Sequence, residues 1–150
     1  MTTIQLKTVL ITGCSTGGIG HAQAKAFQHQ GYHVFATVRD LSTASDLSKL
    51  PNVSVLKLDV HSQTSITSCR DTIAQDTNGK LDVLVNNAGI ESQSPLLDAD
   101  IAAAKELYDV NVWGPLLVTQ AFAPLLIRSK GIIVNQSSID AALNMVWVGT

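Results

Sequence analysis

A glycine-rich turn near the start of the chain constrains its fold more than any other feature. Residues 12–20 read TGCSTGGIG, between a short apolar run and a helical stretch. Gly13 permits a tight turn out of a strand, and a residue without Cβ at Gly18 lets backbone N–H groups approach a phosphate. Gly20 allows a helix to pack closely on the strand. The turn therefore predicts a strand–turn–helix unit that binds a pyrophosphate at the helix N-terminus. A purely structural turn is the alternative.

Short β-rich runs alternate with helical stretches along the rest of the chain. We expect strands at Lys7–Thr12, Tyr32–Val38, Val53–Leu58, Leu81–Asn86 and Gly131–Gln136. We expect helices at His21–Gln30, Leu41–Leu50, Ser62–Thr77 and Asp98–Ser129, the last bent or locally irregular at Gly114 and Pro115. Strands separated by helices form a parallel sheet that is covered on both faces. The sequence therefore predicts a single α/β dinucleotide-binding domain over residues 1–150, a doubly wound, Rossmann-like parallel sheet.

The last segment does not fit a complete sheet of this kind. Ile139–Thr150 is apolar and follows the fifth expected strand, with no further helix after it. That strand would be a bare edge. We therefore expect a domain truncated after the fifth strand, in which Met145, Val146 and Trp147 form part of a substrate pocket wall.

Composition and charge exclude several classes of protein. The net charge is −2, so no basic field favours nucleic acid. Cys14 and Cys69 make neither a disulfide framework nor a metal cluster. No apolar run approaches the roughly 20 residues of a membrane helix, and the start MTTIQLKTVL lacks the features of a signal peptide. We therefore expect no metal, no nucleic acid and no transmembrane segment, and a cytoplasmic location.

The end of the second expected strand indicates the cofactor. Enzymes of this architecture that use NAD place Asp or Glu there to hold the ribose 2′-hydroxyl. This chain has Arg39 there, with Asp40 after it. A guanidinium suits a charged 2′-phosphate, so NADP(H) is expected, with Asp40 facing solvent and further hydrogen bonds from Ser15 and Thr16. A surface arginine in a strand–helix loop is the alternative.

Other polar residues stand where strands end. Asp59 ends the third expected strand and can point into the crevice where ligands bind, although a solvated turn aspartate is the alternative. Asn86 and Asn87 are amides at a strand end, where we expect them to brace the backbone. Asn111 lies mid-helix, where asparagine is a poor helix former, so a capping or bend residue is its alternative. The chain has a serine pair at 137–138, and paired serines commonly do no more than end a strand.

Residues near the turn have plainer readings. Cys14 lies beside a helix N-terminus, which can lower the pKa of a thiol, but we do not favour a redox role for it. His21 and Lys25 are expected to decorate the surface of the first helix.

In order, these motifs resemble those of the short-chain dehydrogenase/reductase family. The family turn is usually one residue shorter, and the longer TGCSxGGIG form is similar to a fungal subgroup that includes NADPH-dependent 1-acyldihydroxyacetone-phosphate reductases. Further matches are LDV at 58–60, NNAG at 86–89, Asn111 in NVWG and the serine pair 137–138. The resemblance implies that Asp59 contacts adenine and that NNAG stabilises the sheet beside the cofactor.

The resemblance also assigns site residues. It implies catalytic roles for Asn111, which holds a water in the proton relay, and for Ser138. Together with Arg39, the residues expected to bind the cofactor are Thr12, Gly13, Ser15, Gly18, Ile19, Gly20, Asp59, Val60, Asn87, Ala88 and Gly89.

The family's general acid is a tyrosine in a Tyr-x-x-x-Lys pair. The two tyrosines, Tyr32 and Tyr108, do not form one, because Ala36 and Val112 stand four positions later. The usual family spacing from the serine, which favours Ser138 over its neighbour, places the tyrosine one residue past Thr150. Two hypotheses follow. Either these residues are the cofactor-binding half of an NADPH-dependent carbonyl reductase or alcohol dehydrogenase, with the C-terminal portion absent, or they are a truncated, inactive nucleotide-binding fragment or pseudoenzyme.

The substrate is less constrained. The subgroup resemblance implies hydride transfer to a small-molecule ketone, either lipid-like or a secondary metabolite. It also implies a homodimer or homotetramer for the full-length form, and allows association with the endoplasmic reticulum or lipid droplets.

Overall fold

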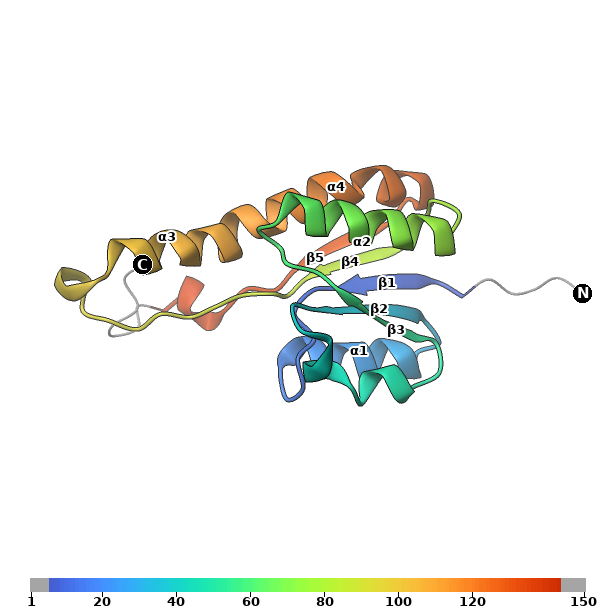
Figure 1. Cartoon of the computed structure of the whole chain (residues 1–150), viewed down its shortest axis with the longest axis horizontal. Coiled ribbons are helices and arrows are strands. Elements are labelled where there is room, and N and C mark those ends of the chain that lie inside the picture. Colours follow the sequence, from blue (N-terminus) through green and yellow to red (C-terminus); the bar gives the residue numbers. More distant parts are fainter. Residues whose placement is uncertain (1–5, 144–150) are drawn as a thin grey trace, which may run out of the picture.

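A five-stranded parallel sheet forms the centre of the molecule. The structure is a computed structural model that describes residues 6–143. The strands are β1 (Thr8–Ile11), β2 (His33–Val38), β3 (Val53–Lys57), β4 (Val83–Asn86) and β5 (Ile132–Asn135). Their order in the sheet is β3-β2-β1-β4-β5, and every pair is parallel (Figure 1). The chain therefore starts at the centre, builds outward to one edge, and returns to build the other, which confirms the predicted doubly wound α/β fold.

Helices cover both faces of this sheet. Helix α1 (Ile19–His29) lies on one face, while α2 (Gln63–Asp76) and α4 (Gly114–Ser129) lie on the other (Figure 1). The core under α1 includes Val9, Ile11, Ala24, Val34 and Leu47. The core under α2 and α4 includes Leu10, Phe35, Ile66, Leu84 and Phe122. Successive residues of β1 thus enter opposite cores, as a strand with both faces buried requires.

The predicted helix at Leu41–Leu50 is wrong in type. The segment forms two 3₁₀ turns, Leu41–Ala44 and Leu47–Lys49. The carboxylate of Asp40 accepts hydrogen bonds from the backbone N and the hydroxyl of Ser42, 2.9 and 2.8 Å away. Short polar side chains that bond nearby backbone favour tight turns over a continuous α-helix.

The expected long helix at Asp98–Ser129 is interrupted. A 3₁₀ turn at Leu96–Asp98 precedes α3 (Ile101–Tyr108), and a π-helical turn at Asp109–Trp113 joins α3 to α4. The irregularity therefore lies just before Gly114. A Cβ on Gly114 would lie 2.9 Å from Cγ2 of Val60, so glycine there lets α4 approach the residues that follow β3.

The helical run from α3 to α4 also bears on membrane association. Ile101–Ser129 contains 29 residues and is apolar enough to cross a membrane by length and composition. The core helix of a soluble protein passes the same test, and Val118, Phe122 and Leu125 of this run pack into the core against the sheet and α2. The absence of a transmembrane segment therefore stays a prediction.

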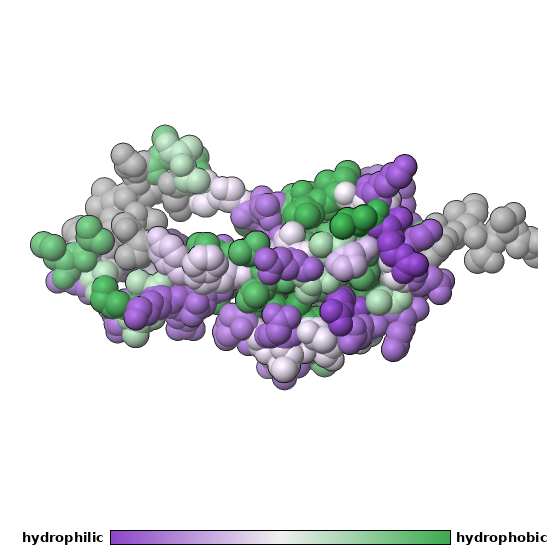
Figure 2. Space-filling view, turned by 90° about the horizontal axis from the view of Figure 1, so that it is seen from above, coloured by the Kyte–Doolittle hydropathy of each residue, from purple (hydrophilic) through white to green (hydrophobic). Residues whose placement is uncertain are grey.

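Apolar side chains are exposed both in β5 and on the helices above the sheet (Figure 2). In β5, Ile132, Ile133 and Val134 are 62, 43 and 42% exposed, whereas β4 beside it is buried. Figure 2 shows apolar patches on the face that the helices above the sheet form. Among the described residues, the fifth strand is an uncovered edge, as the sequence predicted. The expected pocket-wall residues Met145, Val146 and Trp147 lie outside the described residues.

Candidate cofactor site

A cavity of about 330 Å³ opens where the carboxyl ends of the central strands meet. In open α/β sheets this edge is where ligands bind. The cavity brings together residues from the glycine turn, from the ends of β2 and β3, from the NNAG segment and from the π turn. Its lining residues are Gly13, Ser15, Gly18, Ile19, Val38, Arg39, Leu58, Asp59, Val60, Asn87, Ala88, Gly89, Ile90 and Val110. The predicted cofactor residues that do not line it are Thr12, Thr16 and Gly20.

Thr12 and Gly20 lie behind the cavity wall and hold two loops together. The Thr12 hydroxyl accepts hydrogen bonds from the backbone N atoms of Asn87 and Ala88, 3.0 and 2.9 Å away. The Asn87 amide donates to the carbonyls of Thr12 and Gly13, 2.9 and 3.0 Å away. A Cβ on Gly20 would lie 2.5 Å from both Nδ2 of Asn87 and the carbonyl oxygen of Gly13. The glycine turn and the NNAG segment are thereby fixed to each other.

The N-terminus of α1 faces the cavity without a cap. Gly18 is the N-cap residue, no side chain in the described structure caps the helix there, and its first turn contains no acidic residue. Gly13 and Gly17 have φ values of +74° and +85°, the left-handed region that favours glycine. A Cβ on Gly18 would contact only the carbonyl oxygen of Ser15, at 3.2 Å. The space in front of the helix N-terminus is therefore open, and its N–H groups and dipole suit a phosphate.

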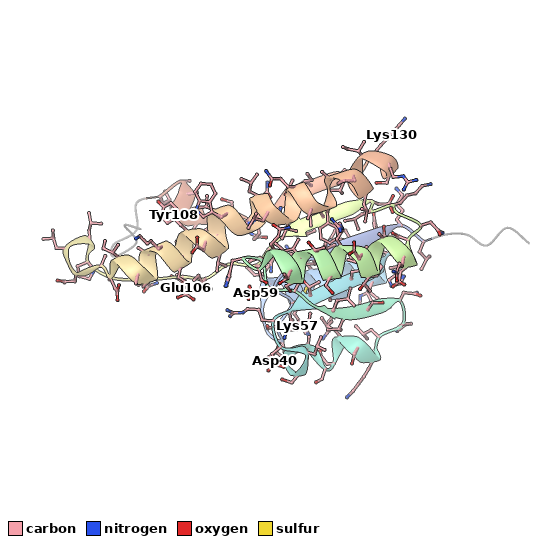
Figure 3. All side chains as sticks on the ribbon, turned by 45° about the horizontal axis from the view of Figure 1, so that its top comes forward. Asp40, Lys57, Asp59, Glu106, Tyr108 and Lys130 are labelled. Atoms are coloured by element: carbon pink, nitrogen blue, oxygen red, sulfur yellow. The ribbon has the colours of Figure 1, made fainter. Side chains whose placement is uncertain are left out.

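Arg39 and Asp40 point to different surroundings at the end of β2. Arg39 lines the cavity, whereas Asp40 does not. Asp40 is exposed, and the hydrogen bonds from Ser42 hold the pKa of its carboxyl below the usual range. Figure 3 shows Asp40, Lys57 and Asp59 at the same end of the sheet. The expectation that Asp40 faces solvent is confirmed.

Asp59 follows β3 and is half-buried at the cavity. Its backbone N donates to the hydroxyl of Ser65, 3.0 Å away, which fixes the start of the loop into α2. Nδ1 of His61 lies 3.3 Å from Oδ1 of Asp59. Asp59 therefore lines the cavity and also contacts the exposed ring of His61.

Two expectations about the turn and the first helix are wrong. Thr16 does not line the cavity, because its hydroxyl donates to the carbonyl of Thr43, 2.7 Å away. His21 does not decorate the surface: it is buried, and its Nε2 lies 2.8 Å from Oδ2 of Asp46. Burial raises the pKa of the Cys14 thiol to about 12, which agrees with the view that Cys14 has no redox role. A helix pattern reports the spacing of apolar residues and could not show these long-range partners.

The two predicted catalytic residues lie beside a neighbouring cavity of about 720 Å³. Asn111 and Ser138 both line it, and it shares Asn87, Ala88 and Gly89 with the cofactor cavity. The structure thus places the predicted catalytic pair next to the predicted cofactor site.

The side chain of Asn111 has a further contact. Its amide accepts a hydrogen bond from the backbone N of Ile90 at 2.9 Å and donates one to the carbonyl of Ile90 at 2.8 Å. It therefore braces the segment after NNAG from within the π turn. Its role toward a water, and that of Ser138 toward substrate, stay predictions.

Sequence reasoning missed several residues of the site. The apolar lining residues Val38, Leu58, Ile90 and Val110 stand next to predicted site residues. For Val38 and Leu58, the place at the end of a strand could have indicated them, whereas Val110 lies in the π turn. A second group lines the larger cavity, where Nδ2 of Asn86 donates to the side chains of Thr119 and Asn135, 3.2 and 2.9 Å away. No local pattern indicates that these three meet.

Comparison with known proteins identifies the family. The family model described as short chain dehydrogenase matches residues 7–149. The chain belongs to the short-chain dehydrogenase family. The turn, the NNAG segment and the order of the strands described above are thus those of a short-chain dehydrogenase.

Several curated relatives come from fungi. The short-chain dehydrogenase cctT of Talaromyces islandicus is 47% identical over 144 residues, which are 96% of this chain and 51% of the relative. The NADPH-dependent 1-acyldihydroxyacetone phosphate reductase of Schizosaccharomyces pombe is 42% identical over 89% of this chain and 45% of its own length. The chain therefore spans about half the length of the curated relatives it matches.

Solved structures share the fold. NADPH-bound carbonyl reductase from chicken fatty liver superposes with a TM-score of 0.83 at 31% identity, over 91% of this chain and 61% of the other. ElxO with NADP bound gives a TM-score of 0.87 at 29% identity, over 96% and 60%. Both neighbours carry an NADP-type cofactor by their descriptions.

Proposed function

We propose that this chain forms the NADP(H)-binding part of a short-chain reductase that transfers hydride to the carbonyl of a small-molecule ketone. The observation that carries the proposal is a single cavity that joins an uncapped helix N-terminus to Arg39, with no acidic residue in the lining at the end of β2. The helix N-terminus suits a pyrophosphate, and Arg39 suits a ribose 2′-phosphate. The NADPH-bound carbonyl reductase and the NADPH-dependent fungal relative support the same cofactor.

The lining residues divide the cofactor among them. Gly18 and Ile19, at the start of α1, would hold the pyrophosphate with backbone N–H groups, and Arg39 the 2′-phosphate. Asp59 and Val60 would border the adenine. The bound cofactor supplies the hydride.

The nicotinamide end would lie toward the second cavity. Ala88 and Gly89 line both cavities and so connect the cofactor site to the predicted catalytic residues. In this proposal Ser138 holds the substrate carbonyl by a hydrogen bond, and Asn111 keeps the segment after NNAG in place through Ile90. The proton must come from a positioned donor near that carbonyl, and neither Tyr32 nor Tyr108 stands in a Tyr-x-x-x-Lys pair.

The substrate, the location and the assembly belong to the same proposal. A lipid-like ketone is supported by the printed name of the Schizosaccharomyces pombe relative, and a secondary metabolite is the second class. We place the protein in the cytoplasm. A homodimer or homotetramer is supported by exposed apolar side chains along the α3–α4 run, such as Tyr108 and Trp113, which are 49 and 52% exposed.

The cofactor assignment is tested by binding of both nucleotides. Isothermal titration of the wild type should show NADPH bound more tightly than NADH, and Arg39→Ala should weaken NADPH by about 10–100-fold, the equivalent of a lost charged hydrogen-bond partner. Arg70→Ala is the matched control, because Arg70 is an arginine on α2 that pairs with Asp71 outside the cavity. Equal or tighter binding of NADH by the wild type would refute the assignment.

A further inference from the structure

Asp46 joins three parts of the chain beside the cofactor cavity. It stands between the two 3₁₀ turns that follow β2. Its Oδ1 accepts a hydrogen bond from the Thr16 hydroxyl at 3.3 Å, and its Oδ2 lies 2.8 Å from Nε2 of His21 and 3.1 Å from Nζ of Lys25. The carboxylate thus ties the segment after β2 to both the glycine turn and α1.

Backbone hydrogen bonds continue this connection to the cofactor residues. The carbonyl of Thr43 accepts from both the backbone N and the hydroxyl of Thr16, at 2.8 and 2.7 Å. The Ser15 hydroxyl lies 3.2 Å from that of Thr43. Thr43 in turn donates from its N and its hydroxyl to the carbonyl of Asp40, at 3.1 and 2.7 Å. A continuous set of hydrogen bonds therefore runs from the glycine turn to the residue beside Arg39.

The charges around Asp46 are balanced within this network. His21 and Lys25 both stabilise the carboxylate and hold its pKa below the usual range, with the His21 hydrogen bond as the larger cause. The His21 side chain is only 10% exposed, so its ring depends on Asp46 as a partner. Asp46 is not among the residues that line the cavity.

We infer that Asp46 is a positioning residue for the cofactor site: it holds the segment that carries Arg39 against the glycine turn and so fixes the distance between the 2′-phosphate and pyrophosphate subsites. This inference rests on the proposed function. The glycine turn has a second anchor in the contacts of Thr12 and Asn87. Loss of Asp46 therefore loosens mainly the Arg39 side, and it affects the nucleotide with a 2′-phosphate more than the one without.

Whether Asp46→Asn weakens or strengthens NADPH binding distinguishes a positioning role from a purely electrostatic one. Asp46→Asn removes a negative charge near an anion site and leaves Lys25 without its counter-charge. Electrostatics alone would then strengthen the binding of an anionic nucleotide. Positioning predicts the opposite, because an asparagine has one acceptor oxygen where the carboxylate has two, so it cannot accept from Thr16 and also from His21 and Lys25.

The experiment measures NADPH and NADH affinity of the wild type and of Asp46→Asn by titration calorimetry. In Asp46→Asn the affinity for NADPH should fall by about tenfold and the affinity for NADH by less than about twofold. In the nucleotide-free protein, amide hydrogen exchange at Thr16, whose N donates to Thr43, should become faster. Asp71→Asn is the matched control: Asp71 is an exposed aspartate of α2 paired with Arg70, and its loss should change neither readout.

Thr16→Val is a second variant that tests the inference if Asp46→Asn does not fold. Thr16 is exposed, and the change removes its hydroxyl bonds to Thr43 and Asp46 while the pairs with His21 and Lys25 remain. It should weaken NADPH in the same direction by a smaller factor. Unchanged or tighter NADPH binding in Asp46→Asn, or an equal loss for both nucleotides, would overturn the inference. A wild type that binds neither nucleotide would instead refute the proposed function, while the exchange rate at Thr16 still reports whether Asp46 holds the turn.

Discussion

The hydroxyl of Thr12 offers the sharpest test of how the site is built. Thr12 is 2% exposed, and its oxygen accepts hydrogen bonds from two backbone N–H groups, those of Asn87 and Ala88. Thr12→Val keeps the shape of the side chain and removes that acceptor. Each buried donor left without a partner costs about 1–3 kcal/mol. Because Asn87 and Ala88 are half-buried and water reaches them in part, we expect the lower part of that range, about 2–3 kcal/mol in total.

Thermal unfolding followed by circular dichroism measures this cost. For a chain of this size 1 kcal/mol lowers Tm by about 2–4 °C, so Thr12→Val should lower it by about 5–10 °C. NADPH affinity should fall as well, since the NNAG segment lines the cavity. Thr12→Ser keeps the oxygen and should cost only about 1 kcal/mol for the lost methyl group.

Thr37→Val is the matched control. Thr37 is 1% exposed, and its hydroxyl donates a single hydrogen bond to the carbonyl of Ile11, 3.1 Å away. Its removal should cost about 1 kcal/mol. If Thr12→Val is no more destabilising than Thr37→Val, the hydroxyl does not hold the two loops together and the reasoning is refuted.

Two further predictions concern packing and burial. Gly20→Ala should destabilise the protein by about 1–3 kcal/mol, because its methyl group would displace the Asn87 amide. Gly18→Ala should leave the Tm nearly unchanged and weaken NADPH binding. Equal Tm values for the two variants would contradict the prediction for Gly20. Burial raises the pKa of both Cys14 and Cys69 to about 12, so the folded state favours the neutral thiols, and the stability this gives is complete below pH 9 and lost as the pH rises toward 12. At pH 9 iodoacetamide should alkylate them far more slowly in the native protein than in urea, and equal rates would show that they are accessible.

Local sequence patterns determined the elements and most of the cavity lining. Each βα unit carries its own signal: an apolar run for the strand, glycines for the turn and a polar residue such as Arg39 or Asp59 after the strand. Because parallel strands present their carboxyl ends at one edge of the sheet, residues predicted one unit at a time converge there without further information. The lining of one cavity by residues from β2, β3 and the glycine turn follows from that geometry.

Contacts between distant segments were decided only by the tertiary structure. Thr12 meets Asn87 across 75 positions of sequence, and His21 meets Asp46 across 25. A helix pattern places His21 on a face but does not say that an aspartate from another loop covers that face. Contacts of the same kind explain why Leu41–Leu50 forms tight turns instead of a helix, since the side chains of Thr43 and Asp46 bond the glycine turn and the Thr43 hydroxyl also bonds nearby backbone. Periodicity reports which face of an element is apolar, whereas the partner of a buried polar group is set by the packing of the whole fold.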